Sequence, residues 1–177
     1  RRSSDLWSWR MWFNEEITYD NTGPGGPSDN GFVNQVQIYR VSPAQEPIIV
    51  FGAGRNLQND TAMRWHVDLI QWAQFDLAQV STPAIPLQQW VHLEAAVTVD
   101  VSGAGGGRIQ FWQDGQLVVD FTGSVMTDFW DRYAISWGMY GHLMGENPIT
   151  IRYDEVLAAT TTTHEHLILP NPTGGWG

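Results

Sequence analysis

Apolar and polar residues alternate with a period of two along most of the chain, which is the pattern of half-buried β-strands. In the segment WSWRMWFN, residues 7–14, the odd positions are large and apolar, whereas Arg10 and Trp12 fall on the opposite face. No window of helical length keeps an apolar stripe at the helical period. The pattern therefore predicts an all-β chain.

The same alternation recurs in segments 32–41, 62–70, 90–100, 133–141 and 149–160, and residues 47–54, PIIVFGAG, are predicted to form a short apolar strand. In FVNQVQIYRV, residues 32–41, it places Val36 and Ile38 in the interior. Gln35, Gln37 and Tyr39 then face outward. Many strands at regular spacing, each polar on one face, predict two packed antiparallel sheets.

Residues 108–123, RIQFWQDGQLVVDFTG, contain the most specific local signal. Two alternating runs are joined by Asp114-Gly115, the dipeptide expected in a type I′ hairpin because both turn residues take positive φ. We therefore expect an all-β, two-sheet antiparallel β-sandwich of the jelly-roll type. One jelly-roll domain would span residues 1–160, followed by a C-terminal extension at 161–177.

Composition narrows the class of protein. The chain has 177 residues, 10 Trp, no Cys and a net charge of −10. This length predicts one domain, and the negative charge argues against general binding to nucleic acid or to an anionic membrane. No apolar run approaches the roughly 18 residues of a membrane helix. The first ten residues, RRSSDLWSWR, lack the apolar centre of a signal peptide, so we expect any secretion signal to have been removed already.

The segments WVHLEAAVTVD, RIQFWQDGQLVVDFTG, YAISWGMYG and ITIRYDEVLAAT resemble, in this order, the concanavalin A-like jelly rolls. The resemblance is greatest to the heparin lyase I-like and alginate lyase-like polysaccharide lyases. In that group a GxxxxWxDGxxVxDxxG hairpin precedes a glycine-tyrosine strand and a final YDE or YDD strand. LWSWRMWF and NQVQIYRVSPAQEPIIV also resemble the early strands of the family, so the similarity spans about residues 6–160.

The resemblance implies β-elimination next to a uronic acid carboxylate, which must be neutralised while a base and an acid act at the reacting carbon. By motif position, Gln37 corresponds to the glutamine of the family and Tyr140 to its tyrosine. With Tyr39 and Arg10 they form the candidate catalytic set. The candidates for binding the polysaccharide are Trp12, Gln35, Arg64, His66 and Ser136.

Three departures from the family pattern argue against robust catalysis. Tyr39 replaces the histidine of the Gln-x-His motif, and Ser136 stands where many members have lysine. The early strand that normally supplies an Arg and a Glu is missing or reduced to RRSSD. The negative charge would also repel a polyuronate unless Arg10, Arg40 and Arg64 gather at the groove.

Several polar groups have a simpler interpretation. His66 with Asp68, and His92 with Glu94, share a strand face and form minimal pairs for metal or acid/base chemistry, but solvated polar faces account for both. Tyr39 and Tyr140 are either ligand contacts or aromatic cover for the sheet, and Trp12 is either a sugar platform or covered by other parts of the protein. We predict no cofactor and no metal site. A structural calcium ion near Asp154-Glu155 stays open, because the remaining ligands cannot be identified from sequence.

Three functions follow. The first is an extracellular or cell-surface protein that binds a polysaccharide with little or no catalysis. The second is an active lyase that cleaves a uronic acid polymer. The third is a structural subunit of a surface assembly that self-associates through residues 161–177, where HLILP could add as a strand to the sheet of a neighbour.

Overall fold

The computed structural model describes residues 4–14, 32–40, 47–54, 62–69, 83–99, 105–125, 133–142 and 150–161. Within these ranges the chain contains no helix and nine strands. They are β1 (Ser4–Phe13), β2 (Phe32–Arg40), β3 (Pro47–Gly54), β4 (Arg64–Leu69), β5 (Trp90–Thr98), β6 (Gly107–Gln113), β7 (Gln116–Gly123), β8 (Tyr133–His142) and β9 (Ile151–Thr161). The predicted all-β class is confirmed.

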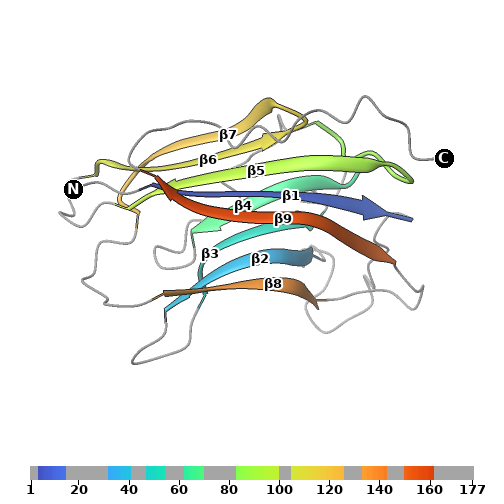
Figure 1. Cartoon of the computed structure of the whole chain (residues 1–177), viewed down its shortest axis with the longest axis horizontal. Helices are drawn as coiled ribbons and strands as arrows, with labels where there is room; N and C mark the ends of the chain where they lie inside the picture. The colour runs from blue at the N-terminus through green and yellow to red at the C-terminus, as the bar shows by residue number, and fades with distance from the viewer. Residues whose placement is uncertain are drawn as a thin grey trace, which may run out of the picture.

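The strands form two sheets that lie face to face (Figure 1). One sheet has five strands in the order β7-β6-β5-β1-β9, and the other has four in the order β4-β3-β2-β8. Every pairing is antiparallel. In Figure 1, β9 and β8 are the lower edge strands of their sheets. The predicted two-sheet antiparallel β-sandwich of the jelly-roll type is therefore confirmed.

Aromatic side chains from both sheets fill the space between them. The Trp9 ring from β1 contacts Phe51 from β3 edge-on, with ring centroids 6.5 Å apart, and Phe13 lies 6.0 Å from Trp65 of β4. Phe111 of β6 lies 5.5 Å from Phe51 and 5.8 Å from Trp65. Each such pair contributes about 0.5–1.5 kcal/mol beyond its buried area. The predicted inward face of β1 is confirmed, and this core holds the sheets together in a chain without disulfides.

The β6–β7 hairpin turns through Asp114 and Gly115, with φ of 49° and 77°. Both values are positive, as the type I′ turn requires, so this prediction is confirmed. The turn is also tied to β5, because the Asp114 backbone N–H donates to the His92 carbonyl at 2.8 Å and the Asp114 carboxylate accepts from the His92 N–H at 3.0 Å.

Strand β2 contains a β-bulge. Along β2 the register advances from Asn34 to Val36, whereas the partner strand β3 advances only from Gly52 to Phe51. Gln35 is therefore the extra residue of β2, and a bulge of this kind shifts the alternation of side chains on either side of it.

The bulge overturns the expectation that Gln35 faces outward. Gln35 is only 1% exposed, and its amide oxygen accepts a hydrogen bond from the Tyr153 hydroxyl of β9, in the opposite sheet. The Gln35 amide nitrogen donates to the Val33 carbonyl at 3.4 Å. Gln35 therefore lies between the sheets, where it cannot contact a ligand on the outer surface.

The described residues include no helix that is long and apolar enough to span a membrane. Strand β9 runs to Thr161, and residues 162–177 lie outside the described ranges. The structure therefore offers no support for self-association through the predicted C-terminal extension.

Candidate functional site

The outward face of the four-stranded sheet carries a set of polar side chains in register. One row across β4, β3, β2 and β8 contains Asp68, Val50, Gln37 and Ser136. The next row contains His66, Gly52, Asn34 and the backbone of Tyr140. We call Asn34, Gln37, Tyr39 and His66 the polar face. Because the inward positions of these strands pack into the core, the polar face lies on the outward side of the four-stranded sheet. Asn34, Gln37 and His66 are nevertheless buried, at 7%, 7% and 4% exposure, whereas Tyr39 is half-buried.

His66 lies across Gly52 and reaches Asn34. Its Nε2 atom is 3.3 Å from the Asn34 amide oxygen and 3.7 Å from a carboxylate oxygen of Asp68. Because both neighbours are acceptors, the proton is assigned to Nε2. A Cβ atom at residue 52 would come within 2.6 Å of His66 Cε1. Glycine at this position therefore leaves the space that the imidazole occupies.

Gln37 and Tyr39 form the second pair of the polar face. They are two residues apart on β2, so their side chains share a face, and the Tyr39 hydroxyl donates to the Gln37 amide oxygen. This contact orients the amide, and the NH₂ end is the remaining hydrogen-bond donor of the side chain. A carboxylate or a sugar hydroxyl is a suitable acceptor.

Strand β8 provides an open area next to these amides. Ala134 and Ser136 are exposed and pair with Tyr39 and Gln37. An added Cβ atom at Gly138 would meet no atom within 4 Å. The small residues of β8 therefore leave room for a ligand beside the more buried amides. The Tyr140 side chain lies outside the described residues, and its predicted catalytic role stays a prediction.

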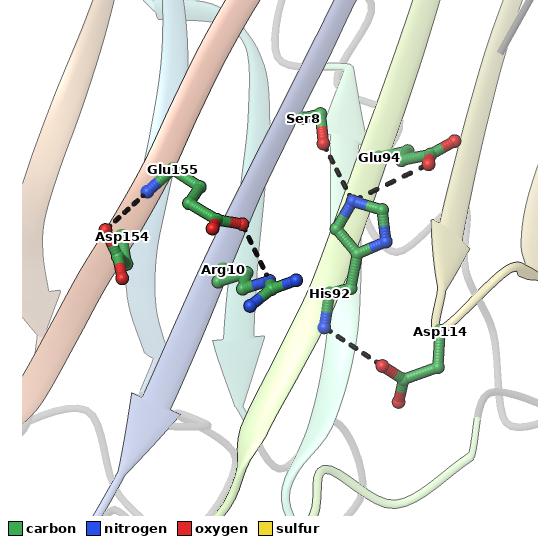
Figure 2. A network of polar contacts seen from close by, with 7 residues as sticks. All are labelled: Ser8, Arg10, His92, Glu94, Asp114, Asp154 and Glu155. Carbon is green, nitrogen blue, oxygen red and sulfur yellow. Dashed lines mark hydrogen bonds and ion pairs between the residues drawn. The ribbon is translucent and has the colours of Figure 1, made fainter. Parts of the chain in front are cut away.

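Arg10 and Trp12 are not part of this face. They belong to β1 of the five-stranded sheet and point to the opposite outer surface, because their neighbours Met11 and Phe13 are in the core. Arg10 Nε is 3.0 Å from a Glu155 carboxylate oxygen (Figure 2). The predicted gathering of Arg10 with Gln37 at one groove is therefore not found.

The other predicted residues can be placed as follows. Arg64 begins β4 and lies on the four-stranded sheet opposite Gly54. The guanidinium of Arg152 lies 4.5 Å above the Trp12 ring, so one face of this predicted sugar platform is already occupied. The side chain of Arg40, which would join the predicted groove, lies outside the described residues.

A second polar network covers the outer surface of the five-stranded sheet (Figure 2). The Ser8 hydroxyl is 2.8 Å from His92 Nε2, and a Glu94 carboxylate oxygen is 3.6 Å from the same nitrogen. In a nucleophile–base–orienter arrangement the carboxylate would bind the other ring nitrogen. Ser8 is also fully buried, at 0% exposure. This network is therefore not arranged for nucleophilic catalysis.

Metal ligands do not gather in the described part of the chain, where no group of three His, Asp, Glu or Cys side chains could hold an ion. At the calcium position considered above, the Asp154 carboxylate accepts a hydrogen bond from the Glu155 backbone N–H at 2.8 Å. Glu155 has a positive φ of 51° and pairs with Arg10. These contacts stabilise an irregular position in β9.

Asn34 is the residue of the polar face that the sequence pattern does not reveal. Strict alternation from the inward residue Val36 would place Asn34 inside and Gln35 outside. The bulge reverses these positions, because Asn34 is reached only after the extra residue. No turn residue such as glycine marks the bulge in the sequence of β2, so the segment itself carries no signal for it.

No protein-family model matches the chain, and no curated protein matches its sequence. Several solved structures share its fold. A double mutant of alginate lyase Aly36B in complex with alginate trisaccharide matches with a TM-score of 0.54 and 14% identity, over 89% of this chain and 70% of that one. Alginate lyase Aly36B itself matches with a TM-score of 0.52 and 15% identity, over 93% of this chain and 72% of that one.

The endo-β-1,4-glucuronan lyase from the fungus Trichoderma reesei matches with a TM-score of 0.59 and 14% identity, over 89% of this chain and 68% of that one. At these identities the likeness concerns the fold. It confirms the predicted jelly-roll fold, which this chain shares with these polysaccharide lyases.

Proposed function

We propose that this protein binds a uronic acid polysaccharide on the polar face. The observation that carries the proposal is the placement of two amides, Asn34 and Gln37, on the outward side of one sheet with Tyr39 and His66, next to the exposed strand β8. The likeness in fold to alginate and glucuronan lyases supports a polysaccharide as the ligand. We further propose an extracellular or cell-surface location, where such polymers occur, and cell fractionation would test it.

The chemistry of binding follows from the orientation of the amides. The oxygen of each amide has a partner within the protein, so the NH₂ ends are the groups that can donate to a uronate carboxylate or hydroxyl. Ser136 and Gly138 leave space for the sugar ring next to Gln37. The binding contacts are thus neutral hydrogen bonds rather than ion pairs.

This mode of binding predicts an unusual response to salt. Ion pairs with a polyanion weaken as salt screens them, whereas hydrogen bonds from neutral amides respond little. The net charge of −10 repels the polymer at long range, and salt reduces that repulsion. Affinity should therefore stay constant or increase between low and physiological ionic strength.

β-Elimination is the second candidate function, and the specific observation that favours it is that Tyr39 and His66 can both transfer protons. A base on the polar face would remove the proton from the carbon next to the uronate carboxylate. The electron pair would form a carbon–carbon double bond, the glycosidic C–O bond would break, and an acid would protonate the leaving oxygen. Arg10 lies on the opposite surface, so neutralisation of the carboxylate would depend on the amides. This favours binding over efficient catalysis.

Calorimetry with alginate, glucuronan, heparin and a neutral glucan tests the proposal. Gln37→Ala should weaken binding of the uronic acid polymer at least tenfold. Gln110→Ala removes the same side chain from β6 of the five-stranded sheet and should leave binding unchanged. Absence of binding to all three acidic polymers, or equal effects of the two substitutions, would refute it. Growth of ultraviolet absorbance from an unsaturated uronate would identify the lyase, and a flat trace would leave binding alone.

A further inference from the structure

Asn34 and Gln37 share a face only because of the bulge between them. Residues three apart on a regular strand point to opposite sides of the sheet. The register nevertheless pairs Asn34 with Gly52 and Gln37 with Val50, both outward positions of β3. The extra residue, Gln35, shifts the alternation by one position, so Asn34 and Gln37 point to the same side of the sheet. Whatever holds Gln35 inward therefore also decides whether the polar face exists.

A contact from the other sheet holds Gln35 inward. Tyr153 pairs with the core residue Met11 in the five-stranded sheet, and its ring crosses the interior toward β2. Its hydroxyl donates to the Gln35 amide oxygen and has the Gly138 carbonyl as a second acceptor at 3.2 Å. The Tyr153 hydroxyl thus contacts β2 and β8, the two neighbouring strands on which Gln37 and Ser136 lie.

Strand β8 is irregular at the same level. Its register with β2 advances by three residues, from Trp137 to Tyr140, while β2 moves by two, from Val36 to Asn34. The carbonyl that Tyr153 reaches, that of Gly138, belongs to this irregular step. The Tyr153 hydroxyl therefore lies where both strands depart from regular pairing.

The hydroxyl can keep this role over a wide pH range. Burial raises the pKa of Tyr153 well above its ordinary value, so the phenol stays protonated and continues to donate. Gln35, at 1% exposure, has no ready access to water as an alternative partner for its amide oxygen. Removing the donor would thus favour rotation of Gln35 out of the interior. The neighbouring side chains of β2, Asn34 among them, would then no longer keep their present side of the sheet.

We infer that Tyr153 is a positioning residue for the ligand-binding amides: by holding Gln35 between the sheets, it keeps Asn34 beside Gln37 on the polar face. The effect on ligand binding rests on the proposed function, whereas the effect on the polar face does not. The ring of His66 reports on the latter, because its Nε2 contacts Asn34.

The test compares Tyr153→Phe with Ser8→Ala. Each removes one hydroxyl that contacts another side chain, but Ser8 contacts His92 on the outward side of the five-stranded sheet, away from the polar face. Nitrogen-15 and proton NMR of the His66 ring, without any ligand, should show a shift in Tyr153→Phe and none in Ser8→Ala. Calorimetry should show at least a tenfold loss of affinity for the bound polymer in Tyr153→Phe only, and this loss should largely disappear in a Gln37→Ala background.

Gln35→Met keeps the length of the side chain and removes its hydrogen bonds, so it provides a second variant if Tyr153→Phe does not fold. Unchanged His66 signals in a folded Tyr153→Phe or Gln35→Met protein would overturn the inference. So would a loss of affinity that adds fully to that of Gln37→Ala, since this would indicate general destabilisation. If the wild-type protein binds no polymer, the proposed function fails and the His66 signals alone decide the inference.

Discussion

Gly52→Ala is the substitution whose effect the structure specifies most directly. The new methyl group would overlap His66 Nε2 and lie 2.6 Å from its Cε1 atom. It would also lie 2.9 Å from the Val33 carbonyl oxygen, which belongs to the neighbouring strand and cannot rotate away. His66 must therefore leave its position over β3 and lose its contact with Asn34.

The expected cost can be worked out from three contributions. Overpacking of a filled site costs about 1–3 kcal/mol. Loss of one hydrogen bond adds about 0.5–1.5 kcal/mol. Removing a glycine from a strand offsets about 0.5–1 kcal/mol of this. We expect a net loss of about 0.5–4 kcal/mol in the free energy of unfolding, which for a chain of this size lowers Tm by roughly 1–16 °C.

Urea unfolding followed by tryptophan fluorescence measures the free energy, and NMR of the His66 ring reports its displacement. Gly138→Ala is the matched control, because an added methyl group there meets no atom within 4 Å. It should be neutral or slightly stabilising. If Gly52→Ala were as stable as this control, with His66 signals like those of the wild type, the reasoning about the imidazole position would be refuted.

Four further predictions use other parts of the structure. Burial raises the pKa of Tyr153 above its ordinary 10.0, so at alkaline pH the folded protein retains a proton that the unfolded chain releases. The free energy of unfolding should therefore decline as pH rises above about 10, and urea midpoints should decline less in Tyr153→Phe. Hydrogen bonding to Arg108 lowers the pKa of Asp120, so this stabilisation is lost as pH falls through the pKa of the folded state. Both side chains are well exposed, and Asp120→Asn should cost less than about 1 kcal/mol by urea unfolding, and less again in high salt. Gly115→Ala should cost about 1–2 kcal/mol in the same assay, because φ is 77° and no atom lies near the added methyl group; an unchanged midpoint would contradict the turn geometry. Tyr39→Phe frees the Gln37 amide to rotate and should weaken binding of the uronic acid polymer by roughly tenfold, or about 1.4 kcal/mol, in calorimetry.

The local pattern of the sequence was sufficient for the strands and for most of their faces. The alternation in β1 placed Trp9 on the large apolar face of its strand, and Trp9 is 1% exposed. The Asp114-Gly115 turn was equally readable, because a two-residue hairpin with positive φ depends on those two residues alone. The resemblance in motifs also predicted a jelly roll, and the solved structures confirm this fold.

The membership of the candidate site was not readable in the same way. Alternation tells which side of its own strand a residue faces, but not which sheet the strand joins. Arg10 and Gln37 both face outward, yet β1 pairs with β5 and β9 while β2 pairs with β3 and β8. Their separation is a consequence of long-range pairing, which no single segment encodes.

Sequence by itself thus determined the class of fold, the strand segments and the inward residues of regular strands, because these depend on a periodicity that is local. Tertiary structure alone decided that Asn34 rather than Gln35 belongs to the polar face. The physical reason is that a bulge forms where neighbouring strands and a contact from the opposite sheet accommodate one extra residue, and here Tyr153, more than a hundred residues away, provides that contact.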